Sequence, residues 1–166
     1  MRYADGPTTE SAAVVAAAAD RIWSLVTDQE WLAGVSEELQ RVEWLDGATG
    51  AGPGVRFRGH NAHPAIGEWS TVSTVTTWEP GHRVRWTVGT DAPDGPAAEW
   101  GFDLDPVDGG TQVRQWARLG PGPSGLTAAI ERWPDKEERI VAGRLEEWRA
   151  GMERNLAAVR RVLEAG

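Results

Sequence analysis

The three histidines are the first residues to consider for acid–base or metal chemistry, because imidazole titrates near neutral pH and binds metal ions. His60 and His63 are three residues apart, while His82 stands alone after a Pro-Gly pair. A three-residue spacing is a metal-binding pattern on a helix, but this segment reads as the end of a strand that runs into a turn. No third ligand is evident nearby in the sequence. We therefore predict no metal site and no cofactor.

Two amide side chains are the strongest polar candidates for contact with a ligand. If Phe57 points toward the interior, then Asn61 does too, because side chains alternate along a strand. By the same rule Val113 places Gln115 inward. Each amide either orients a carbonyl or hydroxyl group of a ligand or satisfies local backbone groups or a buried water.

Tryptophan is the outlier of the composition, with ten residues against two Phe and one Tyr. An indole offers a large apolar area and one N–H donor, so it suits both a plain core and the lining of a cavity. Trp86 and Trp100 alternate with polar neighbours, and Trp148 lies on the apolar stripe of a helix. Trp69 and Trp133 lie near turns, where the mouth of a pocket could be. The predicted ligand-binding residues are Phe57, Asn61, Trp69, Trp86, Trp100, Gln115, Trp133 and Trp148.

Two further tryptophans on predicted strands, Trp78 and Trp116, alternate with the predicted inward positions. We therefore expect both to be partly exposed. Exposed apolar patches are typical of contact surfaces, which makes a second copy of the chain a candidate partner in a homodimer.

No carboxylate is a clear candidate for catalysis. Glu43 and Glu99 alternate with residues that are predicted to point inward, and Asp103 reads as a surface residue. Arg58 shares the face of His60, away from Asn61. No catalytic residue is nominated, and whether the chain is an enzyme is left open.

Length and composition limit the classes of function. The chain has 166 residues, of which 40% are apolar and 25% charged, as in a soluble globular protein. Its net charge of −8 argues against a nucleic-acid partner, which needs a basic surface. The absence of cysteine excludes disulfides and fits a cytoplasmic location. No run approaches the roughly 20 apolar residues of a membrane span, and Ala12–Ala19 is predicted to lead from a strand into a helix rather than to form a signal peptide.

Seven segments read as strands, because apolar residues alternate with polar ones between turn sequences. They are Thr8–Val15, Leu39–Leu45, Val55–Ala62, Glu68–Trp78, Arg83–Gly89, Ala98–Asp105 and Thr111–Leu119. The connections among the last five are too short for parallel crossovers, so neighbouring strands are predicted to be antiparallel.

Helical periodicity is found in four segments, Ala17–Thr27, Gln29–Gly34, Leu126–Trp133 and Asp135–Glu164. A sheet with one apolar face must be covered, and only the last helix is long enough to cover it. We predict an α+β helix-grip fold: a curved seven-stranded antiparallel sheet around a long C-terminal helix, with two short helices after the first strand. It forms one domain over residues 1–166, with its core at about 8–164.

Several motifs together resemble a known family. They are GPGVRFRG at 52–59, Trp69, TTWEPGHRVRW at 76–86 and DGGTQV at 108–113, preceded by Trp31 and by Asp28 after a helix. This combination is similar to the START-like (SRPBCC) superfamily and, more narrowly, to its polyketide cyclase/dehydrase group. The resemblance covers about residues 11–164. It implies the helix-grip fold and leaves the activity open, because one fold supports many functions.

Members of this superfamily include aromatic-ring cyclases, carriers in lipid transport and co-chaperone domains. The first hypothesis is a domain that binds a small hydrophobic or aromatic ligand, polyketide- or lipid-like, between sheet and helix. The second is a cyclase or dehydratase, which would need a group with a shifted pKa in the cavity. The third is a co-chaperone-like interaction domain, with Trp78 and Trp116 on one exposed patch. The only tyrosine, Tyr3, lies outside the predicted core, so a mechanism that needs a pocket tyrosine is not expected.

Overall fold

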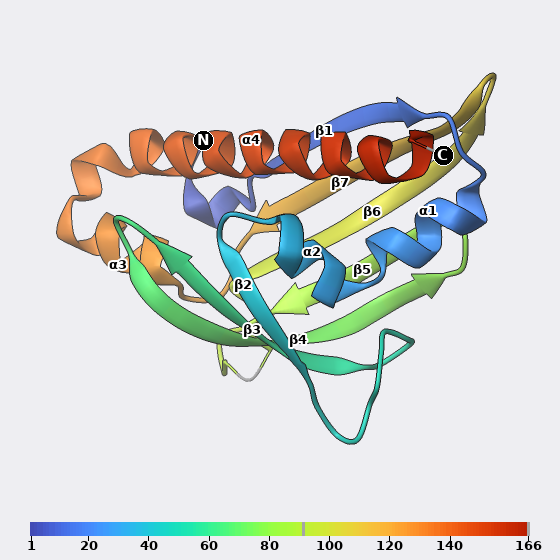
Figure 1. Cartoon of the computed structure of the whole chain (residues 1–166). Coiled ribbons are helices and arrows are strands. Elements are labelled where there is room, and N and C mark those ends of the chain that lie inside the picture. Colours follow the sequence, from blue (N-terminus) through green and yellow to red (C-terminus); the bar gives the residue numbers. More distant parts are fainter. Residues whose placement is uncertain (91, 166) are drawn as a thin grey trace.

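The computed structural model describes residues 1–90 and 92–165, and the strands of this part form one antiparallel sheet (Figure 1). The strands are β1 (Thr8–Val15), β2 (Leu39–Trp44), β3 (Arg56–His63), β4 (Gly67–Glu79), β5 (Arg83–Val88), β6 (Ala98–Val107) and β7 (Gly110–Leu119). Their order across the sheet is β1-β7-β6-β5-β4-β3-β2. From β2 to β7 each strand pairs with the next one in the chain, as short turns require.

The helices are α1 (Ala19–Val26), α2 (Gln29–Val35), α3 (Gly125–Arg132) and α4 (Glu137–Glu164), with short 3-10 helices η1 (Tyr3–Asp5) and η2 (Pro134–Lys136). Asp28 caps α2, because its carboxylate accepts the backbone N–H groups of Glu30 and Trp31. No helix within the described residues is long and apolar enough to cross a membrane. These elements confirm the predicted helix-grip fold.

Helix α4 lies on the concave side of the sheet, alongside β1, with α1 and α2 near its C-terminal half (Figure 1). The main core lies between α1, the sheet and the end of α4, and it includes Ile22, Phe102 and Val159. A second cluster joins Tyr3 and Leu119 to the first half of α4. Tyr3 is therefore a buried packing residue, and its hydroxyl donates to the carbonyl of Gly122 at 2.6 Å.

One irregularity in β4 changes the face on which Trp78 lies. Val75 is opposite Trp86, but the next pair is Thr77 with Arg85, so a β-bulge adds one residue to β4. Trp78 is thereby moved to the inner face, where its ring meets that of Trp23 at 5.0 Å. The prediction that Trp78 is on the outer face is wrong for this reason.

Trp116 does lie on the outer, convex face, opposite Gly101. The guanidinium groups of Arg85 and Arg118 stand over its ring, at 4.8 and 5.5 Å from the centroid. Trp78 and Trp116 are thus on opposite faces of the sheet. They do not form the shared exposed patch that a co-chaperone-like contact surface or a dimer contact was expected to use.

Asp103 also lies on the outer face, as alternation predicts, but its side chain is only 5% exposed. Arg83 and Arg85 each place a nitrogen 2.9 Å from its carboxylate, and Arg114 contacts it as well. Burial alone would raise the pKa of Asp103, but the hydrogen bond from Arg114 and the charges of Arg85 and Arg83 outweigh it. The pKa of Asp103 is therefore lower than usual, and the expectation of a solvated surface residue is corrected.

Candidate functional site: the aromatic inner wall

The inner face of β3 and β4 carries a polar corner beside an indole. Asn61 is directly opposite Leu39 on β2 and opposite Trp69 on β4. Residues directly opposite in an antiparallel pair project from the same face. Asn61 and Trp69 are therefore brought together, and both are half-buried. The predicted inward direction of Asn61 agrees with this pairing.

Three more tryptophans lie on the inner face of β5 and β6 and on α4. Trp86 on β5 is opposite Trp100 on β6, so both project inward. The ring of Trp100 lies 4.7 Å from that of Trp148 on α4, and Trp86 packs against Phe102 at 6.2 Å. We call Asn61, Trp69, Trp86, Trp100 and Trp148 the inner wall.

The polar groups of the inner wall lack hydrogen-bond partners in the part of the chain that the structure describes. This holds for the Asn61 amide and for the indole N–H groups of its four tryptophans. No buried side-chain nitrogen or oxygen of the described residues is left without a partner, so these donors must reach accessible space. By contrast, the Trp44 indole donates to Glu30 at 2.8 Å. The inner wall therefore has unused donors at an accessible surface.

The other three predicted ligand-binding residues have different surroundings. Phe57 is buried in the main core, 5.8 Å from the ring of Trp44. Gln115 is buried on the inner face, and its carbonyl accepts a hydrogen bond of 3.1 Å from Asn155 of α4. Trp133 is 45% exposed, between the cationic groups of Arg132 and Lys136. The structure does not bring Trp133 to the inner wall.

A group of charged residues at the edge of this wall was missed by sequence reasoning. Arg144 of α4 binds both carboxylate oxygens of Glu38, at 2.5 and 3.0 Å, and one oxygen of Glu147 at 3.0 Å. The Nε2 atom of His63 lies 3.0 Å from the same Glu147 carboxylate. We call these four residues the α4 rim. Glu38 and Arg144 are 106 positions apart, so only the fold brings them together.

Arg144 links the α4 rim to the inner wall. Its guanidinium lies 5.4 Å from the ring centroid of Trp148, and its side chain is only 11% exposed. Burial alone would lower the pKa of Arg144, but its hydrogen bonds to Glu38 and Glu147 outweigh it and raise the pKa. The guanidinium is therefore a permanently charged group beside the aromatic wall.

His60 lies away from the inner wall, as predicted, and its Nε2 atom is 3.0 Å from Glu43. A hydrogen bond from Arg41 keeps the pKa of Glu43 below its usual value. Among the described residues no group of three His, Asp or Glu side chains is placed to hold a metal ion. His60 thus belongs to a network on the outer face.

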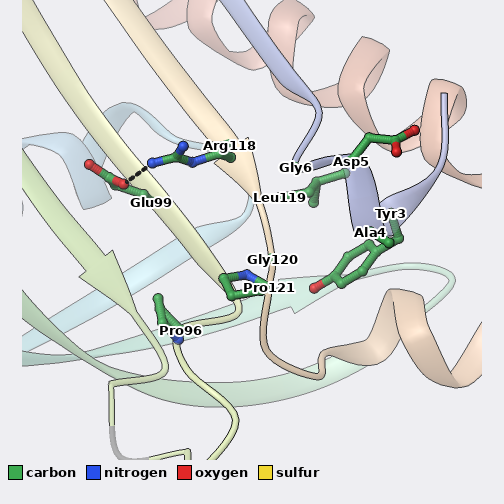
Figure 2. Close-up of a pocket in the computed structure, with 10 residues that line it drawn as sticks. All are labelled: Tyr3, Ala4, Asp5, Gly6, Pro96, Glu99, Arg118, Leu119, Gly120 and Pro121. Carbon is green, nitrogen blue, oxygen red and sulfur yellow. Dashed lines mark hydrogen bonds and ion pairs between the residues drawn. The ribbon is translucent and has the colours of Figure 1, made fainter.

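Two surface pockets lie elsewhere. The first has a volume of about 400 Å³ and is bordered by Tyr3, Arg118, Gly120 and Pro121 among others, with the Arg118–Glu99 ion pair on one side (Figure 2). The second, of about 280 Å³, is formed by the loop between β2 and β3. Neither pocket contains a predicted ligand-binding residue.

A curved antiparallel sheet that holds a long C-terminal helix, with an aromatic wall facing that helix, defines a helix-grip domain. The chain belongs to the family described as polyketide cyclase / dehydrase and lipid transport, whose pattern matches residues 7–164. The resemblance to the polyketide cyclase/dehydrase group is thereby confirmed. A search of the curated proteins finds no match.

Several solved structures share the fold. A Polyketide_cyc-like protein from Corynebacterium glutamicum is 26% identical, with a TM-score of 0.63, and the match covers 95% of this chain and 91% of that one. The Zhui aromatase/cyclase from a Streptomyces species is 20% identical, with a TM-score of 0.66 and coverage of 96% and 98%. The di-domain aromatase/cyclase StfQ of the steffimycin biosynthetic pathway is 16% identical, with a TM-score of 0.70. The match to StfQ covers 95% of this chain and 50% of that one.

Proposed function

We propose that this protein binds a small aromatic molecule carrying carbonyl or hydroxyl oxygens, held against the inner wall between the sheet and α4. The observation that carries the proposal is the set of unused donors on the inner wall, namely the Asn61 amide and four indole N–H groups. Indole rings offer flat apolar area to a planar ligand, and their N–H groups pair with oxygen acceptors. An aromatic polyketide-like compound has both properties.

The inner wall favours binding over acid–base catalysis. Its members are indoles and an amide, which do not titrate near neutral pH. The carboxylates whose pKa values are lowered are held by arginines elsewhere: Glu43 and Asp103 on the outer face of the sheet, and Glu146 on the exposed side of α4. A cyclase could still act by templating the conformation of a reactive chain, so we keep conversion of the ligand as the alternative outcome of the test.

Native mass spectrometry of the freshly purified protein, followed by calorimetric titration with aromatic ketones, tests the proposal. Asn61→Ala and Trp148→Phe should each weaken binding about tenfold, because each removes a donor from the site. Trp133→Phe is the matched control, since that exposed indole lies apart from the wall. Equal affinities in all four proteins, or no binding by any ketone, would overturn the proposal.

The same samples separate binding from catalysis. A ligand that is recovered with its mass unchanged after long incubation supports a binding protein. Loss of one water from a polyketide-like chain, at a rate that depends on the protein, would instead establish the cyclase or dehydratase alternative. Recovery of only fatty-acyl lipids would contradict the aromatic ligand.

A further inference from the structure

The α4 rim borders the polar corner of the inner wall on two sides. On one side Arg144 lies over Trp148, whose ring contacts Trp100. On the other side the carbonyl of Glu38 accepts the backbone N–H of Ala62 at 2.9 Å, next to Asn61. A ligand seated on the wall would therefore have its polar end within reach of the α4 rim.

Two carboxylates already accept most of the N–H donors of Arg144 that a ligand could use. A guanidinium has five N–H donors in a planar fork that suits a carboxylate. Glu38 takes one donor from each terminal nitrogen, and Glu147 takes a further one from Nη1. Glu38 fills the fork between the two terminal nitrogens and Glu147 takes the second hydrogen of Nη1, while the Nε–H and one hydrogen of Nη2 have no hydrogen-bond partner among the described residues.

The charges of the α4 rim do not cancel. One guanidinium faces two carboxylates, which leaves an excess of one negative charge when His63 is neutral. The neighbouring Glu37–Arg154 pair, at 3.1 Å, is balanced. An anionic ligand at this end would meet a repulsive field in spite of the nearby arginine.

We propose that Glu147 is a specificity-determining residue, which keeps the inner wall selective for uncharged ligands because its carboxylate holds one donor of Arg144 and gives the α4 rim its excess negative charge. This inference rests on the proposed function of the wall. Glu147 is the weaker of the two partners, because it makes one bond to Arg144 and its side chain is 51% exposed, against 29% for the doubly bonded Glu38. Removing its charge weakens the contact with Arg144 and balances the charge of the rim.

The experiment measures the ratio of affinities for a carboxylate and a ketone of the same ring system. Two pairs serve as probes, titrated by calorimetry at about pH 8.5, well above the ordinary pKa of an imidazole: 2-naphthoate with 2-acetonaphthone, and 2-anthroate with 2-acetylanthracene. In Glu147→Gln the carboxylate-to-ketone ratio should rise about tenfold, the usual effect of a charge-assisted hydrogen bond. The double variant Glu147→Gln/Arg144→Gln should lose this gain.

Glu146→Gln is the matched control, because it removes the same charge from the adjacent residue of α4, where Glu146 pairs with the exposed Arg149. A ratio that stays at the wild-type value in Glu147→Gln, or rises equally in Glu146→Gln, overturns the inference. If ketones bind the wild-type protein in that case, only the inference fails. If they do not bind at all, the proposed function fails, and the inference with it.

Discussion

Replacing Asp103 by Asn should destabilise the protein more than any other single charge removal on the outer face. The carboxylate is almost completely buried beneath Arg83, Arg85 and Arg114. An asparagine keeps the shape but presents one N–H₂ group to these donors and carries no charge. A hydrogen bond to a charged group contributes about 1.5–3 kcal/mol.

Only one of the three ion pairs of Asp103 is shielded from solvent well enough to contribute its full free energy. Arg85 is 13% exposed, whereas Arg83 and Arg114 are close to half exposed, so solvent screens their share. We therefore expect Asp103→Asn to lower the free energy of unfolding by about 2–4 kcal/mol at pH 7. The exposed pair of Glu99 with Arg118, at 2.7 Å, is the control. Glu99→Gln should cost no more than about 1 kcal/mol.

The pH dependence gives an independent test of the same reasoning. The pKa of Asp103 is lower in the folded protein than its ordinary value of 3.8. The stabilisation by its charge is therefore complete above about pH 4 and is lost as the pH falls through the folded pKa. Urea unfolding should show a difference between wild type and Asp103→Asn that is large at pH 7 and smaller at pH 3. Equal stability at pH 7, or a difference that does not shrink in acid, would refute the role assigned to Asp103.

Three further substitutions test the packing, each by urea unfolding at neutral pH. Gly101→Ala should cost more than about 2 kcal/mol, because the added Cβ would lie 2.2 Å from the carbonyl oxygen of Val84. Gly143→Ala, in the interior of α4 with nothing within 4 Å, should stabilise by about 0.5–1 kcal/mol; equal effects of these two changes would contradict the packing. Trp78→Ala should cost about 2–4 kcal/mol because Trp78 packs on Trp23, and a loss below about 1 kcal/mol would instead indicate an outward indole.

Strand alternation was sufficient to predict much of the inner wall. It placed Asn61 and Gln115 inward and put Trp86 and Trp100 on one face, because β3, β5, β6 and β7 run without interruption across that region. It failed for Trp78 because a single extra residue in β4 reverses every later side chain of that strand. Nothing in the sequence of β4 signals the bulge, since the residue it adds is Thr76, among other threonines.

Long-range contacts between charged residues could not be predicted in the same way. The α4 rim forms only if α4 has the right position along its axis relative to the sheet. This position is determined by the packing of Val141 and Leu145 against Tyr3 and Leu119. The burial of Asp103 depends on arginines from two neighbouring strands folding over it. Neither the position of α4 nor the arrangement of these arginines produces a local sequence pattern that would predict it. Sequence reasoning therefore recognised the fold and a wall, and missed the charged edge of that wall.

The two faces of the sheet divide stability and binding between them. The outer face gains its order from Asp103 and its arginines, and α4 is anchored by the second cluster and by its packing against β1. The protein therefore does not need hydrogen bonds from the half-buried Asn61, Trp69, Trp100 and Trp148, and their donors remain free. If this division is correct, Asn61→Ala and Trp148→Phe should weaken ligand binding while the urea midpoint stays near that of the wild type. Asp103→Asn should do the reverse. A loss of stability in the wall variants as large as in Asp103→Asn would show that the wall is a structural core after all.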